Sequence, residues 1–261
     1  MFTHIVRSLR LAVTWWSLGL FLVPVTSAGA ELRVAAASNF GAALAELAAD
    51  FESRTGHRLR VSLASTGKLY AQVVNGAPFD VLLAADAERP ELLERSGTGV
   101  PGTRFTYAVG ALVLWSRDPS LAGGDCREAL SATAIGHIAL ANPETAPYGA
   151  AARDYLRRAG LWTDVEARLV YGENIAQTLQ FVASGNARAG FIAAAQALDP
   201  RLPGATCRWE VPAELHEPLE QQALLLQHAE DEPAAAEFLA YLRADAARDI
   251  IARHGYLLPA R

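Results

Sequence analysis

From Leu32 onward, short apolar runs alternate with longer stretches in which apolar residues recur at helical spacing. Glycines such as Gly56 and Gly76 close these stretches, as expected where a helix ends in a left-handed residue. The predicted strands are 32–37, 59–64, 79–85, 104–116, 137–141, 167–172, 189–195 and 219–227. The predicted helices are 39–56, 68–76, 88–97, 149–160, 175–185 and 233–254. Strands that alternate with helices predict an α/β fold, with mostly parallel sheets flanked by helices.

The order of these elements predicts two lobes. A long β-rich run leads into a middle section with its own strand–helix pairs, and a later apolar run is expected to return to the first sheet. We expect residues 31–110 and 216–261 to form the first lobe and residues 111–215 to form the second, with a hinge near Gly110 and Leu215. Ligands of such folds bind where the strands end and the helices begin, and the lobes close around them.

Residues 1–30 have the pattern of a signal peptide. A basic start precedes an apolar run, and the small residues Ala28, Gly29 and Ala30 follow it. The alternative is a membrane anchor, but the apolar run is shorter than the roughly 20 residues that a span needs. We expect cleavage after Ala30 and export to a bacterial periplasm.

The composition argues against several partners. The net charge of −5 becomes −7 when Arg7 and Arg10 leave with the signal peptide, which contains no acidic residue. Such an acidic chain is a poor ligand for nucleic acid or an anionic membrane. The 6 histidines show no metal-ligand spacing, so we expect no metal site and no cofactor. Cys126 and Cys207 either pair in an oxidising compartment or remain two buried thiols.

Four predicted junctions between a strand and a helix carry hydroxyl or amide side chains. They are Ser38–Asn39, Ser65–Thr66, the loop 142–149 and Glu173–Asn174. A helix N-terminus leaves N–H groups unpaired and carries partial positive charge, so it favours an anion. Ordinary N-capping explains the same residues. Because each predicted lobe has two junctions, we predict an anion site between the lobes, with capping as the alternative.

The spacing Ser65-x-x-Lys68 also occurs in serine acyl-transfer enzymes. The chain lacks the companion motifs that this chemistry needs, and Lys68 is its only lysine. We therefore expect no enzyme. Instead we expect Gly67 to let an anion approach the backbone, and the Lys68 side chain to point away from it.

Several longer motifs resemble a known family. "RVAAASNF", "NGAPFDVLLAADAERPELL", "PGTRFTYAVGALVLWS", "NPETAPYGAAA" and "HGYLLP" are similar, in this order, to the periplasmic molybdate-binding proteins of ABC importers. The resemblance runs from Glu31 to the C-terminus. It implies a two-lobed periplasmic binding protein of type II, with the ligand in the cleft between the lobes. It also implies a monomeric receptor that captures molybdate or tungstate and delivers it to an inner-membrane permease with its ATPase.

The resemblance also implies a ligand set of hydroxyl groups and backbone amides, in which the metal is bound only as its oxyanion. Carried over by position, the set is Ser38, Asn39, Ser65, Thr66, Tyr148 and Ile175. Ile175 would contribute its backbone N–H. Thr66 is expected to be the direct ligand of the second junction, although Ser65 could exchange roles with it.

The chain departs from the family at Ala193 and at the second junction, which reads Ser-Thr-Gly where many relatives have a serine run. Ala193 stands where one branch has a tyrosine, and we expect Tyr148 to replace that donor. Glu173 lies beside the expected site, where its carboxylate would repel a dianion, so we expect it to point outward or to cap another amide. The remaining alternatives are a receptor for sulfate or phosphate and an exported acyl-transferase that uses Ser65 and Lys68.

Overall fold

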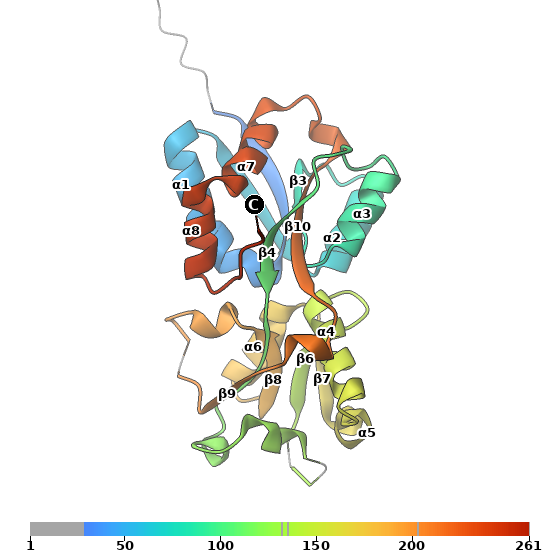
Figure 1. The fold of residues 1–261 in the computed structure, drawn as a ribbon, viewed down its shortest axis with the longest axis vertical. Coiled ribbons are helices and arrows are strands. Elements are labelled where there is room, and N and C mark those ends of the chain that lie inside the picture. The colour runs from blue at the N-terminus through green and yellow to red at the C-terminus, as the bar shows by residue number, and fades with distance from the viewer. Residues whose placement is uncertain (1–28, 132, 135, 203, 261) are drawn as a thin grey trace, which may run out of the picture.

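The computed structural model describes residues 29–131, 133–134, 136–202 and 204–260. Within these ranges the chain forms two α/β lobes stacked along the long axis of the molecule (Figure 1). The predicted signal peptide lies outside the described residues except for Gly29 and Ala30. The prediction of two α/β lobes is confirmed.

The first lobe contains strands β1 (Glu31–Ala37), β2 (Arg58–Ala64), β3 (Val81–Leu83), β4 (Phe105–Gly110) and β10 (Leu219–Leu225). They form one sheet in the order β2-β1-β3-β10-β4. Only β10 runs against its neighbours in this sheet, which explains why the apolar pattern predicts a mostly parallel arrangement. Parallel strands end at a common edge, and β1, β2 and β3 therefore end together at the cleft.

Helices cover both faces of this sheet. They are α1 (Gly41–Thr55), α2 (Thr66–Val74), α3 (Glu88–Arg95), α7 (Pro233–Arg243) and α8 (Asp245–Arg253). Successive strand residues point to opposite faces. Val34 and Ala36 accordingly pack in the cluster formed with α1, α7 and α8, whereas Ala35 packs in the cluster formed with α2 and α3.

The second lobe repeats this plan. Its strands are β5 (Leu112–Ser116), β6 (Ile138–Ala141), β7 (Leu169–Gly172), β8 (Ala189–Ala193) and β9 (Cys207–Glu210), and its α-helices are α4 (Pro147–Arg158), α5 (Trp162–Val165) and α6 (Ile175–Ala183). The strand order is β7-β6-β8-β5-β9, and here β5 is the reversed strand. Side chains of α4 and α5 pack on one face and those of α6 on the other.

The β-rich run 104–116 divides between the two sheets. Its first half, β4, pairs with β10 in the first lobe, and its second half, β5, pairs with β8 and β9 in the second. Figure 1 shows the chain passing between the lobes here and again where it enters β10. A disulfide joins Cys126, in the 3-10 turn η3 (Cys126–Leu130), to Cys207 at the start of β9. It excludes the alternative of two buried thiols.

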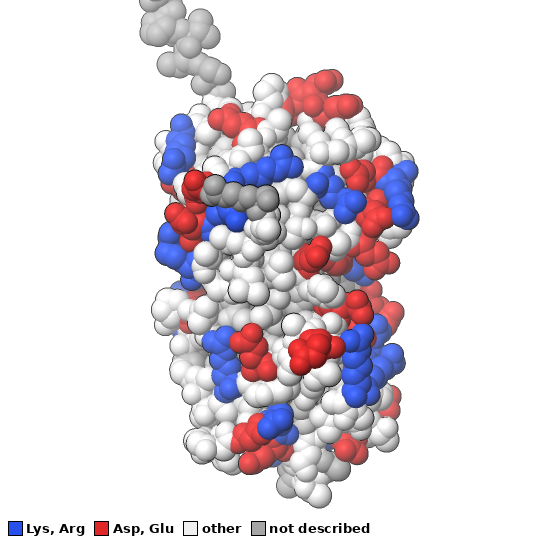
Figure 2. Space-filling model, viewed as in Figure 1, with Lys and Arg blue, Asp and Glu red and all other residues white. Residues whose placement is uncertain are grey.

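Acidic and basic side chains are interspersed on the face shown in Figure 2, with no extended basic surface. This distribution is unlike the concentrated basic patch that binding to nucleic acid requires. Across the described residues, none of the helices combines the length and the hydropathy of a membrane span.

Candidate functional site

The structure brings all six predicted site residues to one small cavity between the lobes. The space free of protein atoms here is about 190 Å³, a figure that includes space open to the solvent. The cavity is lined by Ala37, Ser38, Asn39, Ala64, Ser65, Thr66, Ala85, Ala146, Pro147, Tyr148 and Ile175. The first lobe contributes the residues that follow β1, β2 and β3, and the second lobe contributes the starts of α4 and α6. The lining therefore comes from strand ends and helix starts, as the junction pattern predicted.

Each junction changes from extended to helical backbone at the cavity. Ser65 has φ −69° and ψ 147° before α2 begins, and Asn174 has φ −149° and ψ 174° before α6 begins. The Asn174 side chain accepts hydrogen bonds from the N–H groups of Ala176 and Gln177, at 3.0 and 3.1 Å. The Asn174 cap does not use the N–H of Ile175, which therefore remains available as a donor in the first turn of α6.

Two hydroxyl groups of the first lobe have an uncommitted proton. The Ser65 Oγ atom is buried and has no hydrogen-bond partner among the described residues. Thr66 is fully buried, and its Oγ1 accepts a hydrogen bond from the Ala85 N–H at 3.0 Å, so its own proton remains available. Buried hydroxyl groups are normally satisfied, so an unmatched Ser65 suggests a missing acceptor in the cavity.

Tyr148 supplies the corresponding donor from the second lobe. Its hydroxyl oxygen accepts a hydrogen bond from Gln221 Nε2 at 3.0 Å, which leaves the O–H free to donate. Burial, together with the nearby Tyr256, raises the pKa of the Tyr148 hydroxyl well above its ordinary value. The phenol is therefore neutral at physiological pH. Ala193, at the end of β8, has no polar side chain to compete with it.

Ser38 and Asn39 are less directly available than the sequence predicts. Ser38 Oγ donates to Asn174 Oδ1 at 3.2 Å, so this bond must be exchanged if the hydroxyl is to contact a ligand. Both amide hydrogens of Asn39 are used by Gln221 Oε1, at 2.8 Å, and by the Tyr256 hydroxyl, at 3.1 Å. A role for Asn39 as a direct ligand therefore falls to its backbone N–H, at the start of the 3-10 turn η1 (Ser38–Phe40).

The edge of the cleft carries an ion pair that the sequence did not predict. Lys68 of the first lobe pairs with Glu173 of the second. The Glu173 side chain is 53% exposed, which agrees with the expected outward orientation, and its charge is also paired across the cleft. This pairing also weakens the acyl-transferase reading, because Lys68 is bound to a carboxylate while Ser65 Oγ has no partner among the described residues.

Gly67 has a different role from the predicted one. Its N–H donates to the Thr145 carbonyl of the opposite lobe at 2.8 Å, and so does not face an anion. A Cβ atom at this position would lie 2.9 Å from both the Cα and the carbonyl oxygen of Thr145. The glycine thus permits the backbones of the two lobes to meet.

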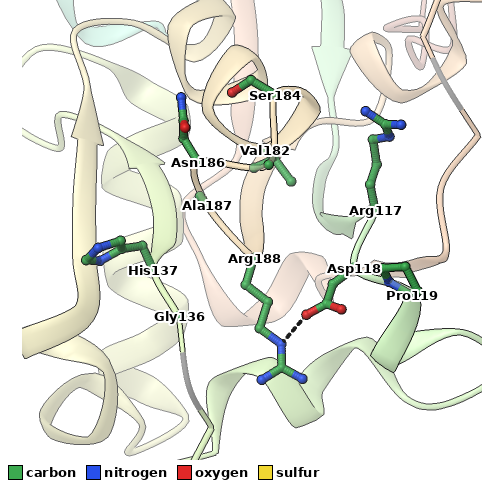
Figure 3. A pocket seen from close by; sticks show the side chains of 11 residues that line it. Arg117, Asp118, Pro119, Gly136, His137, Val182, Ser184, Asn186, Ala187 and Arg188 are labelled. Carbon is green, nitrogen blue, oxygen red and sulfur yellow. Dashed lines mark ion pairs between the residues drawn. The ribbon is translucent and has the colours of Figure 1, made fainter.

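A larger pocket lies elsewhere on the second lobe (Figure 3). It is formed by Arg117, Asp118, His137, Arg188 and neighbouring residues, where β6 and β8 begin and β5 ends. The Arg188 guanidinium pairs with the Asp118 carboxylate at 2.8 Å. This pocket is at the opposite edge of the sheet from the carboxyl ends of β6 and β8, and it includes none of the predicted ligand residues.

The comparisons with known proteins agree with this geometry. The sequence profile described as "Bacterial extracellular solute-binding protein" matches residues 32–257. The chain belongs to this family. It is 45% identical over 241 residues to the molybdate-binding protein ModA of Azotobacter vinelandii, covering 92% of this chain and 95% of that protein. It is 38% identical to the ModA of Rhodobacter capsulatus, covering 98% and 99%.

A solved structure supports the same assignment. The periplasmic molybdate-binding protein of Azotobacter vinelandii superposes with a TM-score of 0.81 and 39% identity, covering 88% of this chain and all of that one. The resemblance stated from the sequence motifs is thereby confirmed. So is the expectation of a binding protein and not an enzyme, because these relatives are solute-binding proteins.

Sequence reasoning missed Gln221, which contacts both Asn39 and Tyr148. One signal was available. Gln221 and Gln222 are adjacent amide residues that directly precede the apolar stretch 223–226 of the predicted strand 219–227. A strand buried on both faces has no solvent-facing position for either amide, so each needs a specific partner.

The two hydroxyl groups of the second junction should respond differently to truncation in the ligand-free protein. Thr66→Ala leaves the Ala85 N–H buried without its acceptor and should lower the free energy of unfolding by about 1–3 kcal/mol. Ser65→Ala removes a hydroxyl that has no partner and should leave stability unchanged or slightly higher. Urea denaturation measures both, with Thr66→Ser as the control that keeps the acceptor. An equal loss in the two alanine variants would contradict the bonding described for Ser65.

Proposed function

We propose that this protein captures molybdate, and tungstate with it, in the interlobe cavity and delivers it to the permease and ATPase of an ABC importer in the inner membrane. The observation that carries the proposal is a small interlobe cavity lined by neutral hydrogen-bond donors from both lobes. The 45% identity to a molybdate-binding protein supports this choice of anion. Molybdenum is the cargo in this proposal, and no resident cofactor is needed.

Neutral donors suit a dianion that is fully ionised. Hydrogen bonds to a charged group each contribute about 1.5–3 kcal/mol, so Ser65, Thr66, Tyr148 and the Ile175 N–H can together replace much of the lost hydration. None of the side chains that line the cavity is a carboxylate, so a protonated oxyanion would find only hydroxyl oxygens, which the site uses as donors, to accept its proton. Leaving that donor unmatched costs about 1–3 kcal/mol, which corresponds to a rejection of roughly tens-fold.

The rejection of protonated anions does not exclude sulfate, because sulfate is also fully ionised. Cavity size and donor spacing are then the only means of exclusion, so a sulfate receptor is the alternative that the donor chemistry leaves open. Molybdate and tungstate differ little in size, and we expect the site to bind both.

Capture requires the lobes to separate and close. In the structure the lobes are joined by the Gly67–Thr145 backbone hydrogen bond and by the Lys68–Glu173 ion pair. The cavity is lined by residues of both lobes, so we expect a ligand to enter when these contacts open. We infer that the closed form, with the anion buried, is the form presented to the transporter.

Export to the periplasm is consistent with the covalent structure. The Cys126–Cys207 disulfide requires an oxidising compartment to persist. The relative of known structure is described as periplasmic. We propose that the chain acts there as a monomer after cleavage of residues 1–30.

Calorimetric titration tests the choice of ligand. We expect molybdate and tungstate to bind with affinities within about tenfold of each other, since neither charge nor hydrogen bonding separates them. Hydrogen phosphate should bind at least roughly tens-fold more weakly, because its proton finds no acceptor. Sulfate is the control that isolates the effect of size. Binding of sulfate or phosphate with no response to molybdate would refute the proposal.

The ion pair at the edge of the cleft predicts a charge effect. Lys68→Ala leaves Glu173 as an unpaired negative charge beside the site and should weaken molybdate binding a few-fold, because an exposed pair contributes about 0–1 kcal/mol. Adding Glu173→Gln should restore the affinity. The loss in the single variant should shrink as salt is raised, since exposed charges are screened. A loss that the second substitution does not repair would mean that Lys68 contacts the anion itself.

A further inference from the structure

We propose that Gln221 is a positioning residue that orients the Tyr148 hydroxyl so that it can only donate a hydrogen bond to the ligand. This inference rests on the proposed function, because it concerns how the same cavity selects its anion. Gln221 lies on β10 of the first lobe and does not line the cavity. Tyr148 lies on α4 of the second lobe, so the bond between them crosses the lobes.

The backbone carbonyl of Asn39 can only accept a hydrogen bond, and it therefore fixes which groups donate and which accept along the network. The Tyr256 hydroxyl donates to the backbone carbonyl of Asn39 at 2.9 Å. Because its proton is used there, the same oxygen acts as an acceptor toward Asn39 Nδ2, at 3.1 Å. This arrangement fixes which end of the Asn39 amide faces Tyr256.

The orientation of the Asn39 amide in turn fixes the orientation of the Gln221 amide. The second hydrogen of Asn39 Nδ2 is donated to Gln221 Oε1 at 2.8 Å. The Tyr107 hydroxyl lies 3.3 Å from that oxygen and also 3.3 Å from the carbonyl oxygen of Ala84, so its single proton is shared between the two acceptors. A rotated Gln221 amide would place its N–H groups against these donors, so the observed orientation is favoured. Gln221 Nε2 must therefore point at Tyr148 and donate to its oxygen.

The consequence for Tyr148 is that its acceptor position is occupied from outside the cavity. Its proton is the only hydrogen-bonding function left to present to the ligand. The network is shielded from water, since Gln221 has 0% and Tyr148 2% of its surface exposed. Without water to supply alternative partners, reversing any member would leave a buried polar atom unmatched.

The packing around the bond is built for this contact. A Cβ atom on Gly110 would lie 2.0 Å from the Tyr148 hydroxyl and 2.9 Å from Gln221 Nε2. Glycine at the end of β4 therefore makes the approach possible. The pairing of β10 with β4 shifts register between Gln221 and Gln222, next to the same point. Since Gln221 and Tyr148 belong to different lobes, the donor-only state of Tyr148 is completed as the lobes close.

A double-mutant cycle between Gln221 and Tyr148 tests the proposal. Gln221→Leu should weaken molybdate binding about tenfold, the size expected when one hydrogen bond to a charged group is lost or misdirected. In a Tyr148→Phe background the same substitution should change the affinity by less than about twofold, because Gln221 acts through the hydroxyl that is already absent. An additional tenfold loss in that background would overturn the proposal.

The selectivity for molybdate over hydrogen phosphate is a measurement that a purely structural role of Gln221 would not change. With Gln221→Leu, the Tyr148 hydroxyl can rotate and accept a proton, so the preference for molybdate over hydrogen phosphate should narrow by about tenfold. Tyr256→Phe, which removes the first member of the network without touching the cavity lining, should narrow the same preference in the same direction. An unchanged ratio in both folded variants contradicts the proposal.

The wild-type titration in this series separates the two proposals. If the wild type binds another oxyanion and not molybdate, the proposed function fails, and the cycle is carried out with that anion. If the wild type binds molybdate but the two substitutions are additive, only the role of Gln221 fails. Circular dichroism of each variant establishes that it is folded before its affinity is compared.

Discussion

A dianion can be buried without a countercharge only when the cavity already holds hydrogen-bond donors aimed at it. The loss of hydration on burial is large, and donors that had to reorient or shed their own partners would recover little of it. This requirement explains the composition of the site. Ser65 Oγ has no partner among the described residues, and the protons of Thr66 and Tyr148 are left free by bonds made to their oxygens. The apolar residues of the lining are mainly alanines, whose side chains offer no hydrogen bond, so recognition depends on the polar groups.

The same requirement explains why two lobes are needed. Ser65 and Thr66 follow β2 in the first lobe, whereas Tyr148 and Ile175 begin helices of the second. Neither lobe alone lines the cavity, so these donors come together only when the lobes are packed. Among the contacts that join the lobes, one ion pair brings Lys68 against Glu173, the acidic side chain at the start of the last predicted junction. An acidic protein can thus receive an anion because its charges are compensated locally.

The parts of this arrangement that follow from local rules could be predicted from the sequence. Alternating strands and helices place strand ends at one edge, and a polar residue before a helix marks a place where backbone N–H groups are free. Those rules indicate Ser38, Ser65, Thr66 and the junction Glu173–Asn174 without knowledge of the fold, whereas the N–H of Ile175 is singled out by the resemblance to a family. Tyr148 and the identity of the anion needed the resemblance to a family, because neither periodicity nor capping distinguishes one buried tyrosine from another.

The remaining features depend on contacts between distant segments. The Asn39 side chain turns toward Gln221, which is 182 positions away, and so does not reach the cavity as a ligand. Gly67 is a glycine because the backbone of Thr145 approaches it from the other lobe. The pairing of Lys68 with Glu173 likewise exists only once the lobes are packed. Local pattern predicts where a side chain starts, but these partners are chosen by tertiary packing.

In the proposed mode of binding, the anion is held intact by hydrogen bonds alone. X-ray absorption at the molybdenum edge of the protein–molybdate complex tests this most directly, because it reports the atoms bonded to the metal. The account predicts the tetrahedral oxo coordination of free molybdate, unchanged on binding. A spectrum showing an expanded coordination shell, with an oxygen, nitrogen or sulfur atom of the protein bonded to molybdenum, would contradict it.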